Sequence, residues 1–178
     1  QTGIGIGDER RLLDELDRQA RHIDGAAGTT LWVAVVDPGR ELLHYSSAGH
    51  LPALLVGPMY SRWLDGARSV PLALPLTHLT NRPTATVRLS DITQLVLYTD
   101  GTVERPGEII DLGLERLRHH LHTTDTLTEL LDAVKDPTAR DDAVVLRVTL
   151  TPGAIGEQPR QEHDTGQESE LSEDQGAR

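Results

Sequence analysis

The chain has 178 residues, enough for one domain with a hydrophobic core. It contains no cysteine, which excludes disulfide bonds and thiolate zinc sites, and its net charge of −11 makes binding to nucleic acid unfavourable. No apolar run approaches the roughly 20 residues that cross a bilayer, and the N-terminal residues lack a signal-peptide pattern. We therefore expect a cytoplasmic protein without a membrane segment.

The charge is concentrated at the C-terminal end. Residues 151–178 contain seven acidic residues and two arginines, a net charge of −5, and very few large apolar side chains. Such a segment cannot bury enough apolar surface to offset the entropy lost when a chain is ordered. We predict one folded domain over residues 1–150 and a disordered acidic tail over residues 151–178.

The first predicted element is a helix in the sequence DERRLLDELDRQARHIDG. Asp8 is a suitable N-cap, and Gly25 stands where a C-cap glycine is expected. Apolar residues recur at helical spacing, namely Leu12, Leu16, Ala20 and Ile23. This spacing indicates an amphipathic helix.

The next segment predicts strands. The sequence TTLWVAVVDPGRELLHYSSAGH indicates two strands joined at Asp37-Pro38-Gly39, a hairpin signal, and PALLVG indicates a third strand. Residues 57–83 show little periodicity, and we expect an irregular connection there with one short strand around Trp63. TATVRL and TQLVLYT then predict two more strands.

The last third of the chain predicts two helices and a strand. One helix begins near Asp111, and its apolar face contains Leu114, Leu117 and Leu121. Thr126 and Glu129 have the spacing of a capping box, which opens a second helix, and DAVVLRVTL predicts a final strand. Strands with helices grouped between them indicate an α+β fold or a layered sandwich.

Three carboxylates stand at the ends of predicted strands. Asp100 directly follows the apolar run Leu95–Tyr98, while Asp141 and Asp142 directly precede another apolar run. If these two strands are antiparallel neighbours, the carboxylates lie at one edge of the sheet. Mn²⁺ and Mg²⁺ favour such oxygen ligands, and Gly101 would let the backbone approach the ion closely. The spacing alone also fits a tight turn at Asp100-Gly101 and a solvated Asp pair.

The histidines offer weaker candidates. His50 follows a strand and could be a metal ligand, an acid or base, or a phosphate contact, but we favour a structural hydrogen-bonding role. His119, His120 and His122 point in different directions on a helix, and we interpret them as a solvated helix face.

Three motifs in order carry a family resemblance: YSSAGHLPALLV, LVLYTDGTVERPGEIIDLGLERL and RDDAVVLRV. They closely resemble the second half of the SpoIIE-type bacterial members of the PPM family, which are metal-dependent, type 2C-like serine/threonine phosphatases. The resemblance extends from about Leu12 to Val148.

The resemblance implies a β-sandwich flanked by helices, in four layers (αββα), with a two-metal Mn²⁺ or Mg²⁺ centre between the sheets. It implies that Asp100 and Asp141 are metal ligands, that Asp142 supports them, and that no catalytic residue is needed beyond the ligands. Metal-activated water would attack phosphoserine on a regulatory protein that resembles an anti-sigma-factor antagonist. A site assembled from this chain could form alone or in a homodimer.

The family also has an earlier Gly-Asp-x-x-Gly-His-Gly motif, which this sequence does not match. We therefore expect the chain to correspond to the C-terminal half of the phosphatase domain. Two hypotheses remain: a phosphatase, or a catalytically inactive half-domain that is a protein-binding module or a remnant.

Overall fold

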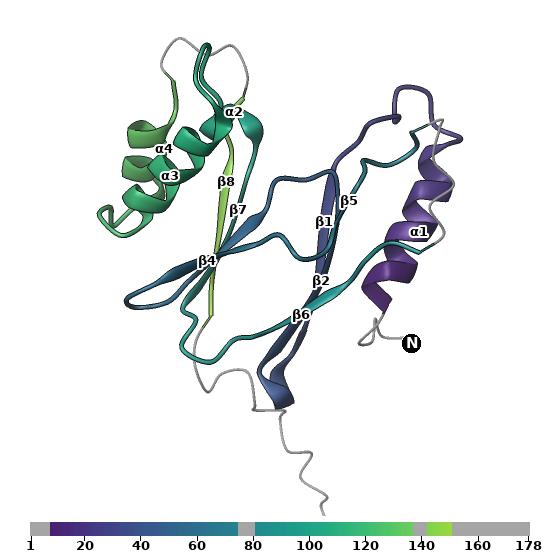
Figure 1. The fold of residues 1–178 in the computed structure, drawn as a ribbon, viewed down its shortest axis with the longest axis horizontal. Helices are drawn as coiled ribbons and strands as arrows, with labels where there is room; N and C mark the ends of the chain where they lie inside the picture. Colours follow the sequence, from purple (N-terminus) through teal and green to yellow (C-terminus); the bar gives the residue numbers. More distant parts are fainter. Residues whose placement is uncertain (1–7, 75–80, 137–141, 151–178) are drawn as a thin grey trace, which may run out of the picture.

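A computed structural model describes residues 8–74, 81–136 and 142–150. Two β-sheets pack against each other, and helices cover their two outer faces (Figure 1). The result is an α+β sandwich with four layers, as predicted. Asp141 and the predicted tail, residues 151–178, lie outside the described residues.

The first sheet is built around β2 (Leu42–Ala48). This strand pairs antiparallel with β1 (Leu31–Asp37) and β6 (Ala85–Arg88), and parallel with the two-residue strand β5 (Arg68–Ser69). The predicted hairpin between β1 and β2 is confirmed. It turns through a short 3-10 helix, Pro38–Arg40, where the Asp37 carboxylate accepts a hydrogen bond from the Arg40 backbone N–H and pairs with the Arg40 guanidinium.

The second sheet has the strand order β4-β3-β7-β8 and is antiparallel throughout. Its strands are β3 (Ala53–Val56), β4 (Ser61–Leu64), β7 (Gln94–Tyr98) and β8 (Val145–Thr149). The predicted short strand around Trp63 is therefore confirmed as β4. The sequence did not predict β5, because two residues show no periodicity.

Apolar side chains that alternate along the strands fill the space between the sheets. Leu43 and Tyr45 of β2 meet Leu55 of β3 and Leu95 of β7 in one buried cluster. The ring of Trp32 stacks on Tyr45 with 5.7 Å between ring centroids. This aliphatic packing holds the two sheets together in a chain that has no phenylalanine.

The outermost strands leave apolar side chains uncovered. Within the described part of the chain, no strand pairs with the outer edge of β1 or of β8. Val36 in β1 and Leu146 in β8 are 40% and 54% exposed. The sandwich is thus open along these two edges.

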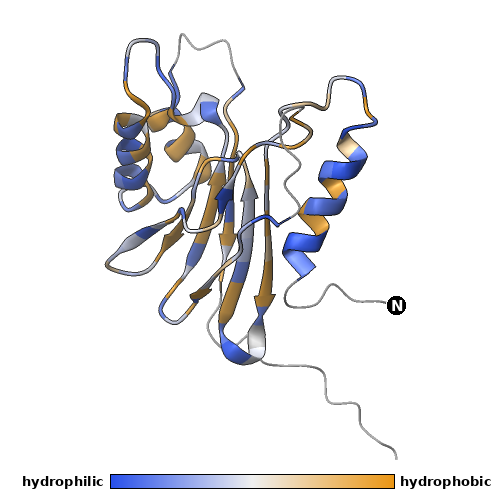
Figure 2. Ribbon diagram, turned by 45° about the vertical axis from the view of Figure 1, so that its right-hand side comes forward, coloured by the Kyte–Doolittle hydropathy of each residue, from blue (hydrophilic) through white to orange (hydrophobic). Residues whose placement is uncertain are grey.

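Helices α2 (Asp100–Val103), α3 (Ile110–Leu121) and α4 (Leu127–Val134) cover the second sheet. The predicted helices α3 and α4 are confirmed, and Thr126 and Glu129 form the predicted capping box. Hydrophilic and hydrophobic residues alternate along the helices, as expected when one face is buried (Figure 2). No helix in the described ranges is both long and apolar enough to cross a membrane.

Helix α1 (Asp8–Ala20) covers the first sheet, but its buried face differs from the prediction. The helix ends at Ala20, five residues before Gly25, and Ile23 is 61% exposed. Its buried residues are Glu9, Leu13, Asp17 and Ala20. The predicted stripe is confirmed at Ala20 and at Leu16, which packs against the same cluster, but it missed Leu13 and the two buried acidic residues, which an apolar pattern cannot indicate.

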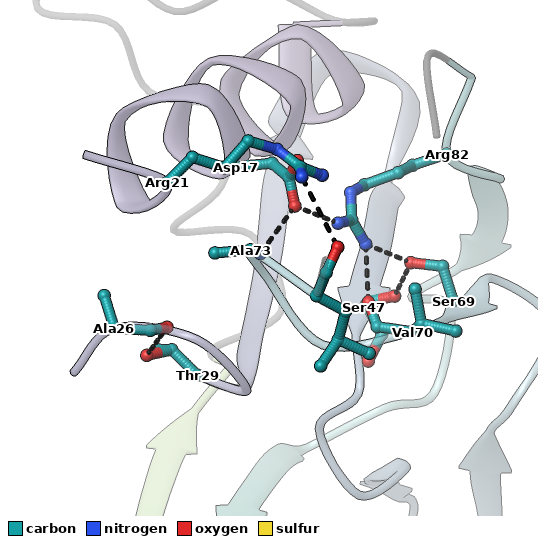
Figure 3. Close-up of polar contacts among 10 residues, drawn as sticks. Asp17, Arg21, Ala26, Thr29, Ser47, Ser69, Val70, Ala73 and Arg82 are labelled. Atoms are coloured by element: carbon teal, nitrogen blue, oxygen red, sulfur yellow. Dashed lines mark hydrogen bonds and ion pairs between the residues drawn. The ribbon is translucent and has the colours of Figure 1, made fainter. Parts of the chain in front are cut away.

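Asp17 is buried because it pairs with the buried Arg82 (Figure 3). One Asp17 oxygen accepts hydrogen bonds from Arg82 Nη2 at 2.7 Å and from the Ala73 N–H at 2.9 Å. Its other oxygen accepts from Arg21 at 2.7 Å. Burial raises the pKa of the Asp17 carboxyl, but these hydrogen bonds outweigh burial and hold the pKa below its ordinary value.

Arg82 extends this network into the first sheet. Its Nη1 donates to Ser69 Oγ at 2.8 Å and to the Val70 carbonyl at 2.7 Å. Ser69 Oγ donates in turn to the Ser47 carbonyl at 2.6 Å. One guanidinium therefore joins α1, β5 and the segment that follows β5, and through Ser69 it reaches β2 (Figure 3).

We predict that Asp17→Asn lowers the free energy of unfolding by about 3 kcal/mol, because it leaves a buried guanidinium without its anion. Urea denaturation at pH 7 measures this, with the exposed α1 substitution Glu15→Gln as the control.

The same ion pair predicts a pH dependence of stability. The folded-state pKa of Asp17 lies below that of the unfolded chain, so the contribution of Asp17 to the free energy of unfolding is present above about pH 4 and is lost as the pH falls. Asp17→Asn should lack this part of the acid sensitivity; equal pH profiles would contradict the assignment.

We also predict that Gly113→Ala destabilises the fold, by about 1–3 kcal/mol. A Cβ at position 113 in α3 would lie 1.8 Å from the carbonyl oxygen of Val103 in α2. Glu115→Ala changes an exposed residue on the same helix and is the control. Equal denaturation midpoints for the two variants would show that α2 and α3 do not require this close approach.

Candidate metal centre

The pairing of β7 with β8 brings two of the predicted segments together. The strands are antiparallel, with Tyr98 opposite Val145 and Gln94 opposite Thr149. The last residues of β7 and the residues before β8 therefore lie at the same edge of the sheet, as the sequence predicted. The Thr99 N–H donates to the Val144 carbonyl at 3.0 Å and continues the pairing beyond β7.

The side chain of Thr99 fixes the segment that contains Asp142. Its hydroxyl donates to the Asp142 carbonyl at 3.1 Å and accepts from the Val144 N–H at 3.0 Å. Thr102 Oγ1 also donates to the Val144 carbonyl, at 3.0 Å. The backbone of Asp142 is thus held beside the residue that precedes Asp100. The described residues do not include Asp141, and its role as a ligand stays a prediction.

Asp100 is the first residue of α2, and its side chain is exposed. One carboxylate oxygen, Oδ1, accepts a hydrogen bond from the Gly101 N–H at 2.8 Å. Gly101 is buried within the same short helix and is not among the described glycines with positive φ. The alternative that Asp100-Gly101 forms a hairpin turn is therefore wrong, because β7 runs into a helix here.

Asp100 and His50 line the same pocket, which has a volume of about 200 Å³. The pocket lies where β2 and β7 end, so one wall comes from each sheet. His50 Nδ1 lies 2.7 Å from the Leu51 carbonyl oxygen. This contact agrees with the structural role that we favoured, although His50 also lines the pocket. The pocket lining is Thr30, Gly49, His50, Leu51, Tyr98, Thr99, Asp100 and Glu104.

Hydrogen bonds from the first sheet hold the His50 side of the pocket. Ser47 Oγ donates to the His50 carbonyl at 3.2 Å, and Ser47 is itself tied to the Arg82 network through Ser69. Gly49 has a φ of 70°, and a Cβ there would lie 2.4 Å from Pro71 Cγ. Glycine is therefore required at this turn.

Tyr98 also lines the pocket. Its hydroxyl donates to the Pro52 carbonyl at 2.8 Å, and burial raises the pKa of this phenol. The hydroxyl thus stays protonated and serves as a hydrogen-bond donor. The sequence patterns identified neither Tyr98 nor Glu104 as pocket residues. Both are within four residues of Asp100, but the pocket that they line forms only where the first sheet contributes Thr30 and the His50 turn.

The histidines of the predicted cluster lie outside this pocket. His119, in the last turn of α3, and His122, the C-cap residue of this helix, are exposed, while His120 is half-buried with its ring 5.3 Å from that of His119. They do not form a metal site with other described residues. The interpretation of a solvated face is thus confirmed for His119 and His122, but not for the half-buried His120.

The sequence places the chain in a known family. Residues 7–151 match the model of the Stage II sporulation protein E (SpoIIE) family, which is more than half of the chain. The chain belongs to the SpoIIE family. No curated protein sequence matches this SpoIIE-family chain at a significant level.

Solved structures show the same fold. The RsbU and RsbW domains of a Mycobacterium tuberculosis protein are 26% identical, with a TM-score of 0.55, over 64% of this chain and 32% of that chain. A bacterial serine phosphatase that bears an arginine-to-alanine mutation is 17% identical, with a TM-score of 0.56, over 85% of this chain and 71% of that one. The SpoIIE phosphatase domain of Bacillus subtilis, described as presoaked with Mn, is 13% identical, with a TM-score of 0.51, over 84% and 76%.

These relatives define the fold class of the SpoIIE-family chain as that of PPM-type serine phosphatase domains. The chain spans about a third of the length of the Mycobacterium tuberculosis structure, which includes a second domain type.

We predict that Thr99→Val releases the segment before β8 from the end of β7. The variant keeps the shape of the side chain but removes the hydroxyl that binds both Asp142 and Val144. Hydrogen exchange of the Val144 amide should accelerate, while that of amides in the centre of β7 should stay as in the wild type. Thr128→Val changes an exposed threonine on α4 and is the control. Unchanged exchange at Val144 would contradict this role.

Proposed function

We propose that this chain is part of a metal-dependent protein serine/threonine phosphatase of the SpoIIE/PPM type. Its substrate would be phosphoserine on a regulatory protein that resembles an anti-sigma-factor antagonist. The observation that carries the proposal is the position of Asp100: an exposed carboxylate at the end of β7, in a pocket between the two sheets, in a chain of the SpoIIE family.

The chemistry of Asp100 fits a hard divalent cation such as Mn²⁺ or Mg²⁺. A carboxylate is the preferred kind of ligand, and no hydrogen bond occupies the second oxygen of Asp100 within the described residues. The number of ligands is smaller than a full site requires, since the described ranges contain no group of three acidic or histidine side chains that could hold an ion. Asp141, which is not described, is the second ligand that we propose.

A bound divalent cation would lower the pKa of a coordinated water and neutralise the charge on phosphoryl oxygens. The residues of this chain hold and orient that site. Asp100 would bind the cation, while the Gly101 N–H keeps its carboxylate oriented. Asp142 would support the site through the backbone that Thr99 holds, and the His50 turn forms the opposite wall.

We propose that the protein acts in the cytoplasm on a protein partner, and not on nucleic acid or at a membrane. The net charge of −11 supports the exclusion of nucleic acid, and the absence of cysteine suits a reducing compartment. Assembly into a homodimer stays a prediction.

We predict that Asp100→Asn weakens Mn²⁺ binding to the chain by at least about tenfold, because it removes a charged oxygen ligand. Isothermal titration calorimetry with Mn²⁺ measures this without relying on turnover. Asp91→Asn removes the same charge from an exposed turn and should bind Mn²⁺ like the wild type, since asparagine tolerates the φ of 62° at that position.

Release of phosphate from a phosphoserine peptide should depend on Mn²⁺ and fall in the same variant. If Asp100→Asn binds Mn²⁺ as tightly as the wild type, Asp100 is not a ligand. Failure of the folded wild-type chain to bind Mn²⁺ would also contradict the proposal.

A further inference from the structure

A second groove lies on another side of the sandwich. It has a volume of about 500 Å³ and shares no lining residue with the Asp100 pocket. It forms where β4, the edge strand of the second sheet, comes close to β6 of the first sheet. Its lining includes three aromatic and two cationic residues, namely Tyr45, Tyr60, Trp63, Arg62 and Arg88.

The two arginines of this groove have no anionic partner. Both are exposed, and no carboxylate in the described ranges forms an ion pair with either of them. Elsewhere the guanidinium groups are mostly paired, as in Arg40 with Asp37 and Arg116 with Glu108. Asp65 also lines the groove, so its lining carries a net charge of +1 in a chain whose total charge is −11.

The C-terminal end of β8 lies close to this groove. The Leu150 N–H donates to the Thr93 carbonyl at 2.8 Å, and Leu150 packs against the cluster that contains Ile92. Ser90, in the turn that leads to Thr93, lines the groove. The chain therefore leaves β8 beside the loop that forms one end of the groove.

The residues that follow have the complementary charge. Residues 151–178 contain seven acidic side chains and two arginines, and the acidic residues Glu168 and Glu170 lie about 20 positions beyond Leu150. An extended chain of that length spans up to about 60 Å, which exceeds the distance needed to reach any part of a domain of this size. Guanidinium groups bind carboxylates through paired hydrogen bonds, and aromatic neighbours favour the same cations.

We propose that the acidic segment 151–178 binds in the groove between β4 and β6, with its carboxylates on Arg62 and Arg88. This inference goes beyond the proposed function, because it concerns neither the Asp100 pocket nor catalysis. Binding is electrostatic and solvent-exposed, so high salt releases the segment, as expected for charges that ions can screen.

A spin label tests the proposal in the full-length chain. The protein has no cysteine, so Ser169→Cys gives a single attachment site between Glu168 and Glu170. With a nitroxide at this position, the amide NMR signals of β4 and β6 should be lost by paramagnetic broadening, relative to the reduced label. About 1 M salt, where the Debye length is about 3 Å, should restore them.

Reversing the charges of Arg62 and Arg88 tests whether the acidic segment binds at these two residues. Arg62→Glu with Arg88→Glu should restore the broadened signals, whereas Arg11→Glu, in α1 and outside the groove lining, with its side chain 82% exposed, should not. The double variant Arg62→Gln with Arg88→Gln removes both charges without reversing them, and it should restore the broadened signals in part. The amide spectrum of each variant with the reduced label reports whether the fold is intact.

Three results would overturn the proposal. If the label does not broaden the signals of β4 and β6, the segment does not bind there. The two arginines would then be a binding site for an acidic peptide of another protein. Broadening that persists in both arginine pairs would place the contact elsewhere. Broadening that fades on dilution would mean that the groove binds the segment of a second copy.

Discussion

A buried guanidinium must have an anion and several carbonyl or hydroxyl acceptors around it, and Arg82 imposes this requirement on the first half of the fold. Its 1% exposure leaves no water to replace a missing partner. Asp17 is thereby drawn to the buried face of α1, and Ser69 and Val70 are held beside β2. One ion pair and its hydrogen bonds thus help to fix α1 and the short strand β5, and through Ser69 they reach Ser47, which holds the turn around His50.

The candidate metal centre depends on a second constraint, the antiparallel pairing of β7 with β8. This pairing places the end of one strand and the start of the other at one sheet edge, and Thr99 ties the two segments together with its side chain. The opposite wall comes from the first sheet, through the turn that Ser47 holds. The shape of the pocket around Asp100 thus depends on how the two sheets pack together, and a change in either sheet alters it.

Charge is distributed unevenly over the molecule, and this unevenness bears on both proposals. Carboxylates at the strand ends suit cations that neutralise phosphate, whereas the unpaired arginines on β4 and β6 suit an acidic peptide. The two places share no lining residue, so a segment bound at the arginines would leave the Asp100 pocket accessible. In a protein with a charge of −11, the groove lined by Arg62 and Arg88 is well suited to attract acidic chain segments.

Local patterns in the sequence were sufficient for most of the secondary structure. The β1–β2 hairpin, the strand around Trp63 and the capping box at Thr126 follow from turn residues, alternation and helix-end chemistry, which act over a few residues. The family motifs also indicated the four-layer sandwich. Tertiary structure alone decided the buried stripe of α1, the helical conformation of Asp100-Gly101 and the pocket shared by Asp100 and His50. Each of these depends on a partner distant in the sequence, such as Arg82 for Asp17, and no periodicity within a segment can reveal a contact made between segments.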